Sequence, residues 1–211
     1  MKNISKKKTA ILIAAVVLIV CAAVACVMLT GKNSHSDNAE LLQGKHYVQI
    51  DIADYGTITA ELDADVAPIT VTNFMKLTDE GFYNGLTFHR IISGFMIQGG
   101  DPNGNGTGGS SQKIKGEFKA NGVENPLAHE RGVLSMARSM ANDSASSQFF
   151  IMHEAAPHLD GQFAAFGKVL SGMEVVDQIC STVPVTDYNG TVSKEHQPVI
   201  TGIKRIEKPA K

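Results

Sequence analysis

Beyond residue 85, the apolar residues of this chain fall into runs of six to eight residues bounded by glycines or polar turns. Runs of this length suit β-strands, because helices are usually about ten residues or longer. The runs lie at 86–92, 95–100, 132–137, 147–153, 163–170 and 200–206. Upstream, apolar and polar residues alternate within the segment 47–62, on both sides of a turn at 54–56. This pattern is typical of a β-hairpin. Because no βαβ rhythm separates these strands, the sequence predicts a mainly β domain with a closed or nearly closed antiparallel sheet.

Two segments have the pattern of a helix instead. Residues 63–81 place apolar side chains on one broad face, with Asp65 as the expected N-cap and Gly81 as the expected stop. A second helix is predicted to begin at Ser171, which would form a capping box with Glu174.

The chain begins with a basic segment, 1–8, followed by 22 uncharged and mainly apolar residues at 9–30. About 20 apolar residues span a bilayer as a helix, whereas the apolar core of a cleaved signal peptide is about 7–15 residues long. We therefore expect an uncleaved single-pass anchor that leaves the lysines in the cytoplasm and the rest of the chain outside, at the cell membrane. Two processed forms are the alternatives: secretion after cleavage near Ala25, and lipoprotein acylation at Cys26.

A polar linker at 31–44 separates this segment from a predicted domain at 45–208. Before residue 31 the chain has four of its 19 Lys and Arg and none of its 21 Asp and Glu. Residues 31–211 therefore carry six more negative than positive charges. This acidic balance, without a basic stripe, argues against binding to nucleic acid. Cys180 is the only cysteine of the predicted domain, which excludes an internal disulfide and a cysteine-based zinc site.

A glycine-rich stretch at 99–109 contains the spacing G-x-G-x-x-G at Gly104, Gly106 and Gly109. The same spacing cradles the phosphates of NAD when it follows a strand and opens a helix. Here the next residues, 110–122, are polar, interrupted by glycine and without helical periodicity. We therefore expect no nucleotide cofactor and interpret the stretch as a loop whose backbone can approach a ligand closely.

The stretch HEAAPH at 153–158 resembles the zinc-binding pattern H-E-x-x-H. Its two histidines are five residues apart rather than four, and Pro157 lies between them, so they cannot share one face of a helix. We therefore expect no metal site.

Arg90 is the unexpected residue of the predicted strands. At a strand's period of two it shares a face with Phe88 and Ile92, where an apolar residue is usual. Pairing with a buried carboxylate would explain it, and so would a role in binding. Gln98 and Gln148 also lie in apolar runs, where ordinary packing is the alternative interpretation. Together these strands offer an arginine, two glutamines and large apolar side chains, but no nucleophile, acid or base.

Several segments together resemble the cyclophilins, the cyclosporin-binding type of peptidyl-prolyl cis–trans isomerase. The resemblance covers residues 46–207 in the family's order. It rests on the stretches FHRIISGFMIQGGD, NGTGG, GVLSMAR, SSQFFI and HLDGQFAAFGKV. It implies a closed eight-stranded antiparallel barrel capped by two α-helices, one over each open end, and a proline-binding groove on the outer surface of the barrel.

The resemblance also implies a site. Arg90 matches the family's catalytic arginine, and Gln98 would hold both this arginine and the substrate backbone. The residues implied to bind substrate are Phe95, Met96, Gly106, Ala137, Gln148, Phe150, His158, Leu159 and Phe163. The implied reaction is rotation about X-Pro bonds of proline-containing polypeptides, which requires neither metal nor cofactor. The predicted anchor places these polypeptides outside the cytoplasm. A proline-peptide binding module or chaperone without significant catalysis is the alternative.

Three positions depart from the best-known family members. His158 stands where cyclosporin-sensitive forms usually have tryptophan, Phe163 where histidine or tyrosine is common, and Arg138 where many have asparagine. These differences leave Arg90 and the implied proline pocket intact. They imply weak cyclosporin binding and leave the sequence preference open.

Overall fold

The computed structural model describes residues 40–209. By its internal contacts the chain divides into two units, Met1–Glu40 and Leu41–Lys211, of which the second is described below. The predicted basic segment, the predicted anchor and most of the predicted linker lie outside the described residues. Within residues 40–209, no helix combines the length and the apolar character needed to cross a membrane.

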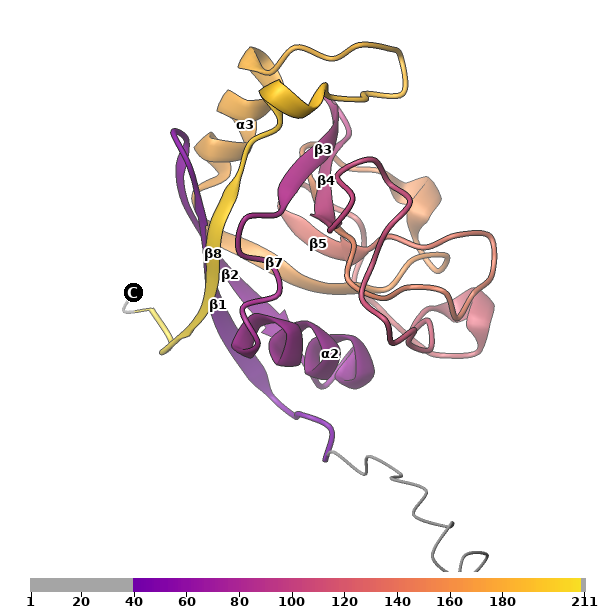
Figure 1. Cartoon of the computed structure of the whole chain (residues 1–211). Coiled ribbons are helices and arrows are strands. Elements are labelled where there is room, and N and C mark those ends of the chain that lie inside the picture. The colour runs from indigo at the N-terminus through magenta and orange to yellow at the C-terminus, as the bar shows by residue number, and fades with distance from the viewer. Residues whose placement is uncertain (1–39, 210–211) are drawn as a thin grey trace, which may run out of the picture. The chain divides into compact units, whose positions relative to one another are not determined.

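Eight strands form one antiparallel sheet, in the order β3-β4-β6-β5-β7-β2-β1-β8 (Figure 1). The strands are β1 (Lys45–Ile52), β2 (Gly56–Asp63), β3 (Thr87–Ile92), β4 (Met96–Asp101), β5 (Val133–Met136), β6 (Phe149–Met152), β7 (Ala165–Ser171) and β8 (Ile200–Ile206). Each apolar run predicted as a strand overlaps one of them, with β4 and β7 ending one residue later than predicted, and the predicted hairpin is the pair β1–β2. The mainly β antiparallel fold is therefore confirmed.

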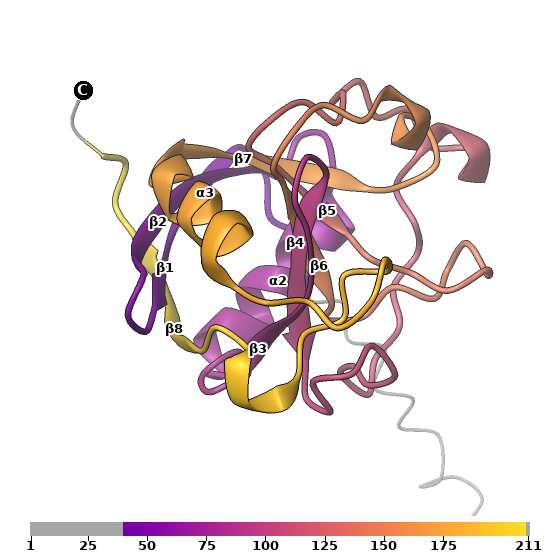
Figure 2. The same ribbon diagram turned by 90° about the horizontal axis from the view of Figure 1, so that it is seen from above.

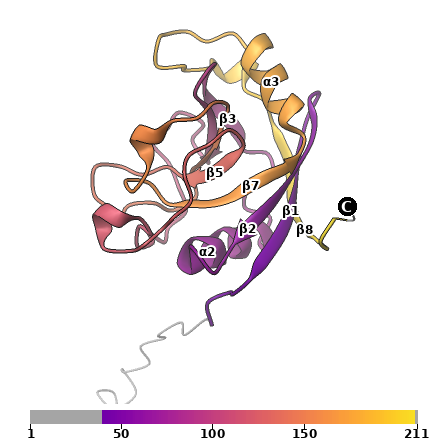
Figure 3. The same ribbon diagram turned by 180° about the vertical axis from the view of Figure 1, so that it is seen from behind.

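The sheet curls so that its two edge strands, β3 and β8, approach each other. Thr87 forms a single bridge with Val199, and Ile200 N donates to Leu86 O at 2.8 Å. No continuous ladder joins β3 to β8 among the described strands. The observed sheet is thus a curled half-barrel, with β1, β2 and β8 forming one wall (Figure 3), and full closure stays a prediction.

Two α-helices pack against opposite ends of the curled sheet. They are α2 (Pro68–Asp79) and α3 (Met173–Thr182), and three short 3-10 turns occur at Lys119–Asn121, Pro157–Leu159 and Lys194–His196. Figure 2, the view from above, shows α3 over one mouth of the sheet with α2 beyond it. The segment 110–122 contains no α-helix, in agreement with its polar and glycine-interrupted sequence.

The core fills the inside of the curled sheet with side chains from strands and helices. Phe74 of α2 lies at its centre, with its ring 5.0 Å from Tyr83, 5.4 Å from Phe149 and 5.2 Å from Phe166 between centroids. All four side chains are completely buried. Removing a buried phenylalanine of this kind costs about 3–5 kcal/mol, so this cluster fixes the strands on which the site is built.

The prediction that Asp65 caps the first helix is wrong. The helix begins at Pro68 and has no side-chain hydrogen bond at its N-cap, Ala67, while the Asp65 carboxylate accepts a hydrogen bond from Gly44 N at 2.7 Å. The buried carboxylate of Glu117 accepts instead from Ile69 N and Thr70 N, at 2.9 and 2.7 Å. Favourable placement of a negative charge at a helix N-terminus explains this arrangement.

The predicted capping box of Ser171 and Glu174 is wrong as well. The second helix begins at Met173, and its N-cap is Gly172, with no side-chain hydrogen bond. Ser171 is still paired with Thr59 as the last residue of β7, so its backbone belongs to the sheet. The chain then turns through Gly172 at φ +95°, where a Cβ would collide with the backbone of β2.

Candidate functional site

A second apolar cluster lies on the outer face of the sheet, away from the main core. It contains Met96, Val133, Phe150, Met152, Ala156, Leu159 and Ala165, with Phe95, Ala137 and Phe163 packed against it. Strands β4, β5 and β6 supply its floor, and the loop between β6 and β7 covers one side. The candidate site is built on this outer cluster.

A β-bulge in β3 turns Arg90 toward this outer cluster. Phe88 is paired with Gly99, and Arg90 with the adjacent Gln98, so one extra residue, His89, is inserted on the β3 side. The insertion interrupts the alternation of faces. Phe88 is therefore buried in the inner core, and the prediction that it shares a face with Arg90 is wrong.

The guanidinium of Arg90 is held by neutral groups. Its Nε donates to the backbone carbonyl of Asn189 at 2.8 Å, and its Nη1 donates to Gln98 Oε1 at 3.2 Å. None of the ion pairs within residues 40–209 includes Arg90, so pairing with a buried carboxylate does not explain this residue. Burial lowers the pKa of Arg90 and the charge of Asp187 opposes this effect. An arginine remains cationic under such a shift.

Two glutamines connect Arg90 to the glycine-rich loop. Gln98 Nε2 donates to Gln148 Oε1 at 2.9 Å, and Gln148 Nε2 donates to the carbonyls of Gly106 and Gly108 at 3.1 and 2.8 Å. Because Gln148 must present its NH₂ to two carbonyls, its oxygen faces Gln98. This in turn leaves the oxygen of Gln98 to accept from Arg90, so each amide has one orientation.

The glycine-rich loop is held by Asp101 at the end of β4. Its carboxylate accepts hydrogen bonds from the backbone N–H groups of Asn103, Asn105 and Gly106, at 2.8, 3.1 and 2.6 Å. Burial alone would raise the pKa of Asp101, but these N–H groups and that of Gly108 outweigh burial and lower the pKa. The loop is therefore built around a carboxylate of its own chain, which differs from a phosphate-binding loop.

An apolar pocket of about 190 Å³ opens beside the guanidinium. Its lining residues are Arg90, Phe95, Met96, Gln98, Ala137, Arg138, Phe150, Leu159 and Phe163. Met96, Phe150 and Leu159 are buried and form the floor. A cationic fork at the edge of an apolar pocket can bind an apolar ring and donate a hydrogen bond beside it, with no group suited to nucleophilic attack.

A larger and more polar cavity of about 410 Å³ adjoins this pocket, and both are lined by Gln98, Ala137 and Arg138. Gly106 and Gln148 line the larger cavity. The structure thus brings every predicted site residue except His158 to one of two adjoining cavities.

His158 and Arg138 lie at the margin of the apolar pocket. His158 is exposed, and its ring stacks on Phe95 with centroids 5.9 Å apart. The guanidinium of Arg138 lies 4.8 Å from the ring of Phe163, and its Nε and Nη2 donate to Gln162 O. The sequence marks Arg138 only as a position that differs from many family members. In the structure it lines both cavities.

Sequence reasoning missed a buried polar network beneath Phe150. The His129 ring stacks on Phe150 at 6.0 Å, with Nδ1 2.9 Å from Asp160 Oδ1 and Nε2 3.0 Å from Ser135 Oγ. Burial lowers the pKa of His129, and the Asp160 carboxylate opposes it. Because Ser135 is completely buried, no substrate reaches its hydroxyl, and the network supports the pocket floor. Asp160 lies 31 residues beyond His129 in the chain, so no local pattern in the sequence indicates that the two side chains meet.

The two histidines of the HEAAPH stretch do not meet. His153 contacts Gly94 and Asp177, whereas His158 lies on Phe95. Within residues 40–209, no group of three or more His, Cys, Asp or Glu side chains is arranged to hold a metal ion.

Comparison with known proteins places this geometry in context. The family model "Cyclophilin type peptidyl-prolyl cis-trans isomerase/CLD" matches residues 47–205. Peptidyl-prolyl cis-trans isomerase B of Bacillus subtilis (strain 168) is 49% identical over 144 residues, which are 68% of this chain and 92% of the relative. A peptidyl-prolyl cis-trans isomerase of Synechococcus elongatus is 48% identical over 140 residues, 63% of this chain and 92% of the relative.

The fold is also similar to that of a solved structure. A cyclophilin type peptidyl-prolyl cis-trans isomerase of Cryptosporidium parvum, determined in the presence of the dipeptide Ala-Pro, superposes with a TM-score of 0.68 and 32% identity. The match covers 77% of this chain and 99% of that protein.

Proposed function

The chain belongs to the cyclophilin-type peptidyl-prolyl cis–trans isomerases, and from this premise we propose that its Arg90 pocket accelerates X-Pro bond rotation in client proteins outside the cytoplasm. The observation that carries the proposal is the position of Arg90. Its guanidinium carries no ion pair within the described residues and lies at the edge of an apolar pocket large enough for a pyrrolidine ring. The Cryptosporidium parvum relative was solved in the presence of the dipeptide Ala-Pro, which supports this class of ligand.

The chemistry of the reaction requires little more than this geometry. Rotation about an X-Pro bond faces a barrier of about 18–20 kcal/mol, because twisting the amide breaks its resonance. The lone pair of the proline nitrogen localises only in the twisted state. A guanidinium hydrogen bond to that nitrogen is therefore stronger in the transition state than in the ground state, which is the condition for catalysis. Lowering the barrier by about 7 kcal/mol would accelerate rotation roughly 10⁵-fold.

The residues around Arg90 have complementary roles in this proposal. Phe95, Met96, Phe150 and Leu159 would hold the proline ring and exclude water from the twisting bond. Gln98 would bind the substrate backbone while its oxygen orients Arg90. The larger cavity lined by Gly106, Ala137 and Gln148 would accept residues that precede or follow the proline.

The proposal is tested by adding the full-length protein to a peptide whose X-Pro isomers differ in an NMR signal and measuring their exchange. We expect exchange to become faster in proportion to protein concentration. A protein that binds the peptide, as shown by shifted peptide signals, but leaves its exchange rate unchanged would be a binding module instead. The geometry of Arg90 and Gln98 argues against that alternative, because binding alone requires neither an oriented guanidinium nor its glutamine support.

We propose that the domain acts outside the cytoplasm, held to the cell membrane by the apolar segment 9–30. The four lysines before this segment and its 22 uncharged residues support a single-pass orientation with the lysines inside. Mass spectrometry of the native N-terminus distinguishes the intact anchor from cleavage near Ala25 and from acylation at Cys26. Protease digestion of intact cells, compared with lysed cells, tests the side on which the domain lies.

A further inference from the structure

Phe95 forms a wall of the apolar pocket, yet it stands in a turn rather than in a strand. The turn joins β3 to β4, with Gly94 at φ +78° and Phe95 N donating to Ile92 O at 2.9 Å. Phe95 is only partly buried, and its outer face meets the exposed ring of His158. Its position therefore depends on whatever holds the turn.

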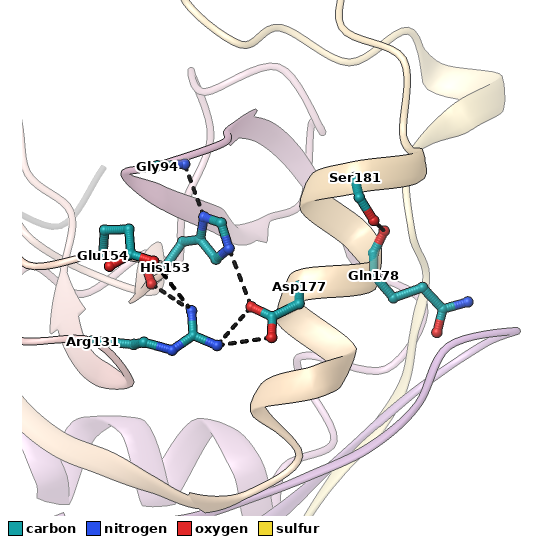
Figure 4. A network of polar contacts seen from close by, with 7 residues as sticks. All are labelled: Gly94, Arg131, His153, Glu154, Asp177, Gln178 and Ser181. Carbon is teal, nitrogen blue, oxygen red and sulfur yellow. Dashed lines mark hydrogen bonds and ion pairs between the residues drawn. The ribbon is translucent and has the colours of Figure 1, made fainter.

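His153, directly after β6, holds this turn at two points, and Figure 4 shows the one at Gly94. Its Nδ1 accepts a hydrogen bond from Gly94 N at 2.8 Å, and its backbone N donates to Phe95 O at 2.8 Å. Glu154 N also donates to Phe95 O, at 3.3 Å. Any residue except proline at position 153 would retain the backbone contact, but only a side chain with a correctly placed acceptor can bind Gly94 N.

The contact with Gly94 determines the tautomer of the imidazole. Because Gly94 N is a donor, Nδ1 carries no proton, and the proton of the neutral ring is on Nε2. Nε2 lies 3.1 Å from Asp177 Oδ1 on α3 and therefore donates to it. The imidazole thus connects the turn of Phe95 to α3.

Arg131 completes the network. Its Nη2 donates to both oxygens of Asp177 at 2.7 and 2.8 Å, and its Nη1 donates to His153 O at 2.7 Å. The hydrogen bonds from Arg131 lower the pKa of Asp177, so this carboxylate stays ionised and continues to accept from His153. Glu154 Oε1 lies 3.7 Å from Arg131 Nη1, so Arg131 forms an ion pair with a second carboxylate as well.

We propose that His153 is a positioning residue that sets the place of Phe95 in the substrate pocket through its hydrogen bond with Gly94. The inference rests on the proposed function, because it assigns Phe95 to the proline-binding wall. Phe95 would contact the proline ring equally in the ground and transition states. Loss of its position should therefore weaken substrate binding and leave the rate of bond rotation in the complex largely unchanged.

Three substitutions distinguish the contribution of the Nδ1 contact with Gly94 from that of the Nε2 contact with Asp177. In His153→Asn the amide oxygen can take the place of Nδ1 and accept from Gly94 N. In His153→Gln the longer amide reaches the place of Nε2 and can donate to Asp177, but offers nothing to Gly94. His153→Ala removes both contacts. Ser181→Ala is the control, because Ser181 lies on α3 one turn beyond Asp177 and bonds only within the helix, to Gln178 O at 3.0 Å.

For each full-length variant, NMR titration with a proline peptide gives Kd, and isomerisation kinetics give kcat and KM. All measurements are made below the melting temperature of the least stable variant. We expect His153→Ala and His153→Gln to raise Kd and KM about fivefold, the loss of about 1 kcal/mol that one hydrogen bond supplies, with kcat within about twofold of the parent. His153→Asn and Ser181→Ala should stay within about twofold of the parent in all three quantities.

The inference is overturned if His153→Gln keeps the parental Kd while His153→Asn loses it, because the contact with Asp177 would then be the important one. It is also overturned if all three variants match the parent, or if kcat falls with KM unchanged. A parent protein that binds the peptide but does not isomerise it would contradict the proposed function alone, since the order of the Kd values would still test the role of His153. If His153→Ala does not fold, the comparison of Asn with Gln decides.

Discussion

Gln98 Oε1 accepts a hydrogen bond from Arg90 Nη1 at 3.2 Å, while the NH₂ of the same amide is bound to Gln148. Arg90 is thus oriented by a neutral acceptor that is itself held in one orientation. A neutral partner leaves the full positive charge of the guanidinium available to a substrate, which a carboxylate partner would not.

Arg90→Ala should lower kcat/KM for isomerisation at least about 100-fold, equivalent to about 2.7 kcal/mol of transition-state stabilisation, while the protein stays folded. Arg90→Lys should not restore activity, because an ammonium lacks the planar fork that reaches both Gln98 and the proline nitrogen. Arg205→Ala is the matched control, since Arg205 forms a surface ion pair with Asp79. An Arg90→Ala protein that retains more than a third of parental kcat/KM would contradict the catalytic role.

Gln98→Glu should lower kcat/KM about tenfold or more, although the side chain keeps nearly the same shape. A carboxylate at this position would form an ion pair with Arg90 and hold its charge in the ground state, and it could not donate to Gln148 Oε1. Gln178→Glu adds the same charge on the exposed face of α3 and should leave the rate unchanged. The explanation would be wrong if Gln98→Glu were as active as the parent.

Stability should decrease as the pH falls below about 6.5, the ordinary pKa of histidine. Burial lowers the pKa of His89 and of His129 in the folded protein. Between these lowered values and about 6.5, the unfolded chain binds more protons than the folded one, so the free energy of unfolding falls as pH falls. Denaturant titrations at pH 8, 6.5 and 5 measure this directly.

His89 supplies a test of the same effect. Both of its ring nitrogens are buried and have no hydrogen-bond partner among residues 40–209, so His89→Leu removes a titrating group without removing any hydrogen bond seen there. The variant should lose less stability than the parent between pH 6.5 and 5, whereas His196→Asn, at an exposed position, should behave like the parent. Equal stability of the parent at pH 8 and 5 would show that neither buried histidine has a lowered pKa.

The strands could be predicted because each is marked locally, by alternation of apolar and polar residues in β1 and β2 and by a short apolar run in the others. Elements that depend on distant residues could not. Glu117 caps a helix that begins 49 residues earlier, at Pro68, and nothing near that helix indicates it. The bulge at His89 likewise depends on pairing with β4, so periodicity alone placed Phe88 on the wrong face.

In the candidate site, too, some residues could be predicted from the sequence, whereas the contacts between them could not. Arg90, Gln98 and Gln148 could be singled out because polar residues are unusual in apolar strands, and the family resemblance assigned roles to them. Their mutual hydrogen bonds, and the carbonyl of Asn189 from a distant loop, are visible only in the folded chain. In the sequence His153 stands out only as part of a failed metal motif, because its partners Gly94 and Asp177 are far from it along the chain.

His158→Trp should strengthen cyclosporin binding at least about tenfold, or about 1.4 kcal/mol, while changing peptide isomerisation much less. His158 is exposed and stacks on Phe95 at the margin of the pocket, without lining the cavity itself. An indole there would add a broad apolar surface and an N–H donor for a large apolar ligand. A small proline peptide should depend instead on the pocket floor formed by Phe150 and Leu159. Inhibition titrations of the parent and the variant with one peptide substrate measure both effects, and tight inhibition of the parent would show that His158 does not limit drug binding.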